Sequence, residues 1–179
     1  AAFAAEYNVK DGSVEIVAKD GIQTITQRDD TGAFVKDQKG DIDHRQDYDI
    51  ILTTKNKDTG ETETTSNTVT ITAEEKGDTA NVTLQDVNIA VDTVKAKSGA
   101  IEIKGDGKTN LALNGANTVL VENDWSEEHA AIEKADKYGH GTLTIKDDVN
   151  DNGKPKTGTK ADTTGTLVAG GFQYYHHRW

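Results

Sequence analysis

Short stretches of the chain alternate apolar with polar residues, and this period of two is typical of a β-strand with one buried face. The clearest examples are Val69-Thr70-Ile71, Ile101-Glu102-Ile103 and Leu143-Thr144-Ile145. Dipeptides that favour tight turns occur between such stretches: Asp11-Gly12, Asp20-Gly21, Asp106-Gly107 and Asn152-Gly153. The pattern therefore predicts an all-β protein of short strands joined by turns.

Several of these strands resemble one another at a nearly constant spacing. Ala-Ile-Glu occurs at 100–102 and again 31 residues later at 131–133. Val82 corresponds to Leu111 at a spacing of 29 residues, and Leu111 corresponds to Leu143 at a spacing of 32. Such a period favours a β-solenoid, in which the inward Val, Ile and Leu of one coil stack on those of the next. A β-sandwich, in which similar strands pair as hairpins across two sheets, is the alternative.

Residues 124–139 also fit a helix. Asp124 could cap it, acidic residues fill its first turn and Gly139 could end it. The repeat instead places a strand around Ile132, after a loop that carries Trp125. We favour the strand, because the repeat supports it independently of the helix signals.

The chain has the size of one domain, since 179 residues contain no Pro- or Ser-rich hinge that would divide them. We expect residues 1–6 to be a remnant of a signal-peptide region or a linker, because they contain the small-x-small pattern of a secretory cleavage site. Residues 7–179 then form a single β-solenoid domain with insertion loops near 122–130 and 147–165. No apolar stretch is long enough to span a bilayer.

Charge and composition argue against several classes of function. The net charge of −11 argues against nucleic acid as a partner, because a phosphate backbone is bound by clustered Lys and Arg. The absence of cysteine excludes a disulfide framework, a thiolate zinc site and a catalytic thiol. The sequence has no nucleophile elbow, phosphate loop or dinucleotide fingerprint, so we expect a protein that is not an enzyme.

The order of the strand motifs carries a family resemblance over roughly residues 67–147. Asn81-Val82-Thr83-Leu84-Gln85-Asp86-Val87-Asn88-Ile89 is followed by Ser98-Gly99-Ala100-Ile101-Glu102-Ile103 and then by Leu111-Ala112-Leu113-Asn114-Gly115-Ala116-Asn117-Thr118-Val119. This series resembles bacterial extracellular right-handed parallel β-helix domains of the carbohydrate-binding, adhesin-like kind, including autotransporter passenger domains. The resemblance implies a right-handed β-helix at the bacterial cell surface, and some relatives of that kind bind pectic polysaccharide and calcium.

A candidate calcium site lies in the segment from Asp148 to Gly153, which matches the front half of a calcium-binding loop. Asp148, Asn150 and Asn152 place oxygen ligands on alternate positions, and the glycine permits a sharp turn. The distal acid of a complete EF-hand is missing, because Thr159 stands in its place. We predict a weaker calcium site, with an Asn-Gly turn in a solvated loop as the alternative.

Two groups of aromatic residues are candidate ligand-binding sites. The C-terminal group comprises Tyr174, Tyr175, His177 and Trp179, and the second group comprises Trp125, His129 and Tyr138. Exposed rings suit the apolar faces of sugars, and histidine supplies hydrogen bonds. The alternatives are a final strand that caps the solenoid and a ring packed over the coil.

These features together predict an extracellular bacterial surface binding domain, adhesin-like, that recognises a glycan or a host or cell-wall ligand with assistance from calcium. The first alternative is a structural stalk or a self-associating surface scaffold, which predicts that Trp125 and Tyr174 are buried. The second alternative is a polysaccharide lyase-like enzyme, which predicts a groove with carboxylates flanking a Lys or Arg.

Overall fold

The computed structural model describes residues 5–148 and 165–174, without the side chain of Tyr174, and this part of the chain is almost entirely β-structure. Within it, α1 (Thr93–Ala96) is the α-helix, and η1 (Val9–Asp11) and η2 (Asp136–Tyr138) are 3₁₀ turns. The all-β prediction is therefore confirmed. No helix among these residues has both the length and the apolar character needed to cross a membrane.

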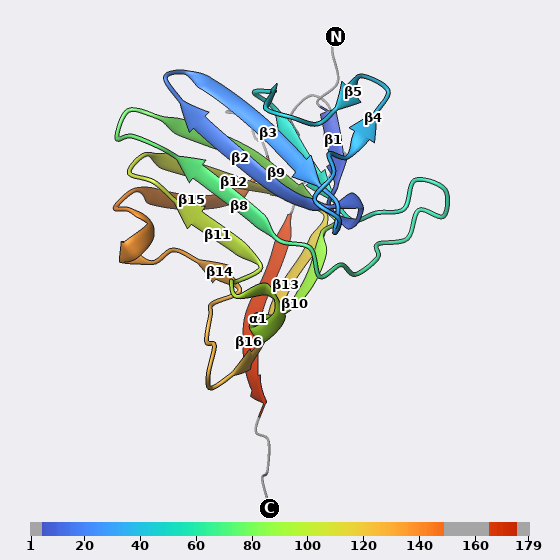
Figure 1. Ribbon diagram of the computed structural model, residues 1–179, viewed down its shortest axis with the longest axis vertical. Coiled ribbons are helices and arrows are strands. Elements are labelled where there is room, and N and C mark those ends of the chain that lie inside the picture. The colour runs from blue at the N-terminus through green and yellow to red at the C-terminus, as the bar shows by residue number, and fades with distance from the viewer. Residues whose placement is uncertain (1–4, 149–164, 175–179) are drawn as a thin grey trace, which may run out of the picture.

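Two sheets of the described residues are wholly parallel (Figure 1). The first contains, in spatial order, β1 (Ala5–Asn8), β7 (Ile50–Thr53), β9 (Thr79–Gln85), β12 (Lys108–Asn114) and β15 (Thr142–Asp147). The second contains β10 (Asn88–Asp92), β13 (Ala116–Asp124) and β16 (Thr166–Tyr174). Parallel strands need long connections, and from β7 onward consecutive strands of the described chain belong to different sheets.

A third sheet is mixed. Its parallel part runs through β14 (Ile132–Glu133), β11 (Ile101–Lys104), β8 (Val69–Ala73) and β2 (Ser13–Lys19). Its antiparallel part adds β3 (Ile22–Arg28) and β6 (Arg45–Gln46) beyond β2. A small hairpin of β4 (Lys36–Asp37) and β5 (Gly40–Asp41) lies apart from it. Antiparallel pairs of strands are thus confined to residues 13–46 of the described chain, apart from isolated bridges such as Lys55 with Thr62, so the repeat region is not the hairpin-built sandwich that was the alternative.

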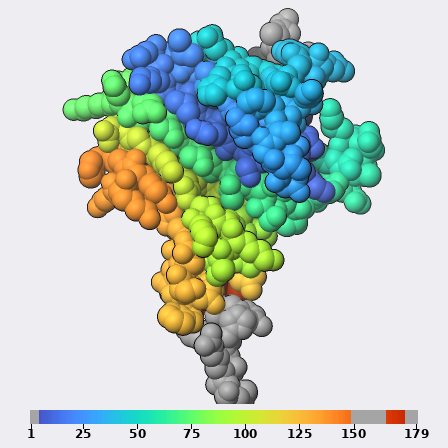
Figure 2. Space-filling view, in the orientation of Figure 1, coloured from blue at the N-terminus to red at the C-terminus, as the bar shows by residue number. Residues whose placement is uncertain are grey.

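The chain visits the three sheets in a fixed order: β8, β9 and β10, then β11, β12 and β13, then β14, β15 and β16. In Figure 2 the segments of this series that are visible form adjacent bands, from green through yellow to orange, down one side of the molecule. Ile132 pairs with Ile101 and Leu111 with Val82, which confirms the spacings of 31 and 29 residues.

The third predicted correspondence is wrong, because Leu111 lies opposite Ile145 and not Leu143. A slip of two residues leaves every side chain on the same face of the strand, so alternation alone cannot detect it. The spacing from Leu111 to its true partner is longer than predicted because the connection between β14 and β15, which contains η2, is longer.

The predicted strand around Ile132 is confirmed as β14, and residues 124–139 do not form the alternative helix. The loop expected near 122–130 begins later than expected, because β13 continues to Asp124 and pairs there with Tyr174. The second expected loop, near 147–165, falls largely on residues 149–164, outside the described residues.

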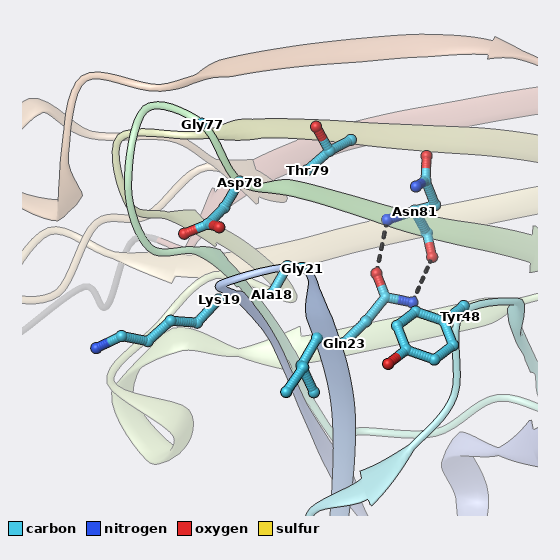
Figure 3. Close-up of a pocket in the computed structure, with 10 residues that line it drawn as sticks. Ala18, Lys19, Gly21, Gln23, Tyr48, Gly77, Asp78, Thr79 and Asn81 are labelled. Carbon is cyan, nitrogen blue, oxygen red and sulfur yellow. Dashed lines mark hydrogen bonds between the residues drawn. The ribbon is translucent and has the colours of Figure 1, made fainter.

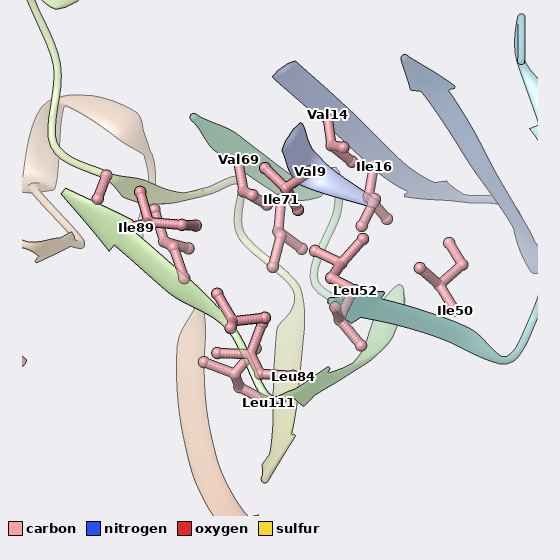
Figure 4. Close-up of a cluster of buried hydrophobic side chains, with 14 of the residues drawn as sticks. Val9, Val14, Ile16, Ile50, Leu52, Val69, Ile71, Leu84, Ile89 and Leu111 are labelled. Carbon is pink, nitrogen blue, oxygen red and sulfur yellow. The ribbon is translucent and has the colours of Figure 1, made fainter. Parts of the chain in front are cut away.

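The hydrophobic core lies between the three sheets (Figure 4). Each sheet contributes inward apolar side chains at alternate positions, including Ile71, Leu84, Ile89, Ile101 and Leu111, all without exposed surface. Each such side chain contributes about 1.5–3 kcal/mol when it leaves water. A chain with few apolar residues therefore folds around one interior to which all three sheets contribute.

Two turns show why glycine stands where it does. Asp20 and Gly21 have φ of 53° and 76°, the left-handed pair that joins β2 and β3 as the Asp-Gly dipeptide predicts. Gly105 has φ of 89° after β11, and a Cβ there would lie 1.9 Å from the Ala73 carbonyl oxygen. Any larger residue at Gly105 would have to displace backbone of the neighbouring repeat.

Candidate functional site

The structure brings two predicted site residues, His129 and Tyr138, into one group of side chains. Both contact Glu133: His129 Nδ1 lies 2.8 Å from its Oε2, and the Tyr138 hydroxyl donates to the same oxygen at 3.2 Å. The Tyr138 hydroxyl also lies 3.2 Å from Glu102 Oε1, and His129 Nε2 lies 2.8 Å from Glu127 Oε1. We call these five residues the His129 cluster.

The repeat itself builds this cluster. The two copies of Ala-Ile-Glu pair in parallel, so Glu102 of β11 and Glu133 of β14 are direct neighbours across the strands. Like charges opposite one another destabilise a sheet unless a cation lies between them. Lys104 Nζ is 3.4 Å from Glu102 Oε2, and the His129 ring is 2.8 Å from Glu133. Lys104, and His129 when it is protonated, offset part of the repulsion.

The surroundings of the cluster shift three pKa values, and that of Glu127 is lowered, chiefly by its hydrogen bond with His129. Burial alone lowers the pKa of His129, but the hydrogen bonds and charges of Glu127 and Glu133 outweigh it and raise that pKa above its usual value. Burial, followed by the negative charges of Glu102 and Glu133, raises the pKa of Tyr138. Tyr138 therefore remains a neutral hydroxyl donor at physiological pH.

Trp125, which was predicted to lie with His129 and Tyr138, does not join this cluster. Trp125 lies in the turn after β13 with 71% of its surface exposed, and Tyr174 ends β16 opposite Asp124. Tyr175, His177 and Trp179 lie outside the described residues. The C-terminal aromatic site therefore stays a prediction.

Only one of the three predicted calcium ligands lies among the described residues. Asp148 is only 2% exposed, and its backbone N–H donates to the Leu113 carbonyl oxygen at 2.9 Å. It thus belongs to the end of the first sheet and not to an open loop. Asn150 and Asn152 lie outside the described residues, so the calcium loop stays a prediction.

A second candidate site, which sequence reasoning missed, surrounds Tyr48 (Figure 3). Its pocket has a volume of about 300 Å³ and is lined by Tyr48, Gln23, Asn81, Thr79, Asp78 and Lys19, among others. The Tyr48 side chain is exposed, at 57% for the residue, whereas Gln23 below it is 3% exposed. An exposed aromatic ring thus lies above a buried polar side chain.

Three hydrogen bonds hold the Gln23 side chain in place. Its Nε2 donates to the Asp47 and Asn81 carbonyl oxygens at 2.9 and 3.1 Å, and its Oε1 accepts from the Asn81 backbone N–H at 2.8 Å. Gln23 lies on β3 and Asn81 on β9, so the amide joins two different sheets. It also fixes the segment that carries Tyr48, because Asp47 precedes that residue.

From this pocket a polar face extends across β9, β12 and β15. Parallel register aligns its side chains into two rows, which are Thr79, Lys108 and Thr142, and Asn81, Asn110 and Thr144. All are exposed except Asn110, which is half-buried, and the Asn110 Nδ2 donates to Asn81 Oδ1 at 3.0 Å. We call these two rows the polar face.

The two sites are suited to different chemistry. The carboxylates of Glu102 and Glu133 have only 9% and 15% of their side-chain surface exposed, so a polymer cannot reach them, whereas an ion could. The Tyr48 pocket and the polar face offer a ring, amides and hydroxyls to a ligand in solution. These groups can bind a ligand by stacking and hydrogen bonding, which requires no activated nucleophile.

The missed residues left only weak signals in the sequence. Tyr48 lies in an irregular segment before the repeats, so no period pointed to it. The pairing of Glu102 with Glu133 was implicit in the repeated Ala-Ile-Glu, but its meaning depends on the strands being parallel neighbours.

A scan of protein-family models, a search of curated proteins and a search of solved structures each found no match to the chain.

Proposed function

We propose that this chain is a surface binding domain, acting outside the cell, that recognises a glycan on the polar face with Tyr48 as its aromatic contact. The observation that carries this proposal is the exposed Tyr48 ring beside a hydrogen-bonded array of amides, Gln23, Asn81 and Asn110. Sugars combine apolar faces with rings of hydroxyls, and aromatic and amide side chains match those two properties.

The proposal includes a β-solenoid for the region from β8 onward. Support comes from the fixed order in which the chain visits the three sheets and from the parallel pairing of each strand with its equivalent in the next repeat. In a solenoid the outward side chains of successive coils form rows, which is the property that a binding face for an extended polymer requires.

The rigidity of the scaffold favours binding. Asn81 and Asn110 are held on strands and by a mutual hydrogen bond, so a ligand does not have to order them. Ordering a free side chain on binding costs about 0.5–1.5 kcal/mol, and this cost is already met here in the folded protein. The exposure of Trp125, which a purely structural stalk predicted to be buried, also favours a binding role.

Polysaccharide binding measured by glycan array and then by calorimetry tests the proposal. Tyr48→Ala should weaken binding about tenfold, since a stacking contact with an aromatic ring contributes about 0.5–1.5 kcal/mol beyond area burial and about 1.4 kcal/mol is tenfold in affinity. Asn110→Ala should weaken it less, because one neutral hydrogen bond contributes about 1 kcal/mol. Trp125→Ala is the control, because it removes another exposed ring away from the polar face.

Two results would contradict this assignment. If no glycan binds the wild-type chain, the proposed function is wrong. If a glycan binds but Trp125→Ala weakens it and Tyr48→Ala does not, the ligand occupies the loop that carries Trp125 and not the polar face. Circular dichroism of each variant separates loss of binding from loss of fold.

A further inference from the structure

The His129 cluster has the donor set of a metal site. One ligand atom each from Glu102, His129 and Glu133 can be chosen such that all three lie within 4.8 Å of one another. Zinc bonds of about 2.0–2.2 Å place the ligand atoms of a tetrahedral site about 3.4 Å apart. Small side-chain rotations would therefore bring these donors onto one ion.

The donors come from elements that are already held in place. Glu102 and Glu133 are fixed by the parallel pairing of β11 with β14. His129 is fixed by its backbone N–H, which donates to Asn123 Oδ1 at 2.9 Å, while the Asn123 Nδ2 donates back to the His129 carbonyl oxygen at 3.0 Å. A site assembled from strand positions and a pinned loop needs little reorganisation to bind an ion.

Charge also favours a cation at this point. Glu102, Glu127 and Glu133 supply three carboxylates, and Glu102 and Glu133 are mostly buried. Lys104, at 3.4 Å from Glu102, offsets one of these charges. Carboxylates removed from water are costly unless paired, so a divalent ion between Glu102 and Glu133 would stabilise both.

Glu127 supplies the outer support that a metal-bound histidine usually has. With Nδ1 of His129 facing Glu133 and the other donors, Nε2 is 2.8 Å from Glu127 Oε1. A carboxylate that accepts the second ring N–H fixes the orientation and the tautomer of a ligating imidazole. Acidic residues alone do not provide this arrangement, which distinguishes the cluster from a solvated acidic patch.

We propose that Glu102, His129 and Glu133 bind one divalent first-row transition ion, of which Zn²⁺ is the representative, with the Tyr138 hydroxyl beside it. A nitrogen donor together with carboxylates suits such an ion better than calcium, which prefers oxygen ligands throughout. The ion would link β11 and β14 to the 125–131 loop, which carries Trp125. This site is separate from the polar face, so either proposal can fail without the other.

Calorimetry of the chelator-treated chain with ZnCl₂ tests the proposal. We expect one zinc ion per chain, and binding at least 100-fold weaker in Glu133→Gln and His129→Gln. Glu127→Gln should weaken zinc binding about 10–100-fold, because Glu127 acts only by orienting the His129 imidazole. This is the range for residues that hydrogen-bond to a metal ligand. Because Glu127 is partly exposed, this variant probes the site without disturbing the core.

Two controls identify the site. His140→Gln removes an exposed histidine outside the cluster, and His176→Ala with His177→Ala removes the adjacent histidines near the C-terminus. Unchanged zinc binding in both controls, with loss in the cluster variants, supports the proposal. It is overturned if the wild-type chain binds no zinc, if binding persists in Glu133→Gln and His129→Gln, or if only the His176/His177 variant loses it.

Discussion

Replacing Gln23 by leucine tests whether one buried amide holds the antiparallel hairpin to the first sheet. Leucine has a similar size but makes none of the three hydrogen bonds that join Gln23 to Asp47 and Asn81. Since Gln23 is 3% exposed, water cannot readily replace those bonds. The Asn81 backbone N–H and two carbonyl oxygens would lose their side-chain partner.

The expected loss of stability follows from these contacts. Each net hydrogen bond contributes about 0.5–1.5 kcal/mol, and a buried group left unsatisfied costs about 1–3 kcal/mol. The gain from burying an apolar side chain offsets part of that loss, which leaves about 2–4 kcal/mol. For a domain of this size, the Tm should fall by roughly 5–15 °C.

Urea unfolding followed by circular dichroism measures this change. Gln38→Leu is the matched control, because it makes the same substitution at an exposed position and should alter the free energy of unfolding by less than about 0.5 kcal/mol. If Gln23→Leu is as stable as Gln38→Leu, the bridging amide does not stabilise the fold and the reasoning fails.

Three further predictions concern the core, a turn and a charged pair. Ile71→Ala should lower the free energy of unfolding by about 2–5 kcal/mol in denaturant melts, because Ile71 has no exposed surface and leaves a cavity; a loss below 1 kcal/mol would mean that the core is not shared as described. Gly105→Ala should cost more than the 1–2 kcal/mol of a left-handed φ, since its Cβ would meet the Ala73 carbonyl oxygen, and an unchanged Tm would contradict the turn geometry. Hydrogen bonding to Arg45 lowers the pKa of Asp37, so this pair stabilises the β4–β5 hairpin above the ordinary carboxyl pKa and is lost as pH falls through the lowered value. The protection factors of the hairpin amides, corrected for the pH dependence of intrinsic exchange, should fall in that acidic range in the wild-type chain, whereas in Asp37→Asn they should be low at every pH.

Much of the fold could be predicted because the chain repeats. Alternation identified the strands, and the second Ala-Ile-Glu located β14 where helix signals competed with it. The register of Leu111 could not be predicted, because its true partner Ile145 and the expected Leu143 point the same way. Hydrophobic patterning determines a face, but the length of the intervening turn determines the register.

The candidate sites were less accessible to sequence reasoning. His129 and Tyr138 were predicted to lie together with Trp125, which the structure leaves outside the cluster. Glu133, which joins His129 and Tyr138, was recognised only as part of the repeat. Tyr48 gave no signal, since its surroundings depend on the contact between β3 and β9, far apart in the sequence. A site formed by residues from separate strands has no local pattern that marks it.

The parallel register of β9, β12 and β15 also gives the polar face a direction. Neighbouring strands lie about 4.8 Å apart, so a chain molecule laid across them along the second row meets an uncharged polar group at each step, Asn81, then Asn110, then Thr144. A molecule laid along one strand meets every second side chain only, and on β9 and β12 these differ in kind. The face should therefore discriminate by orientation, and a polymer of suitable repeat could shift by one strand and still find equivalent contacts.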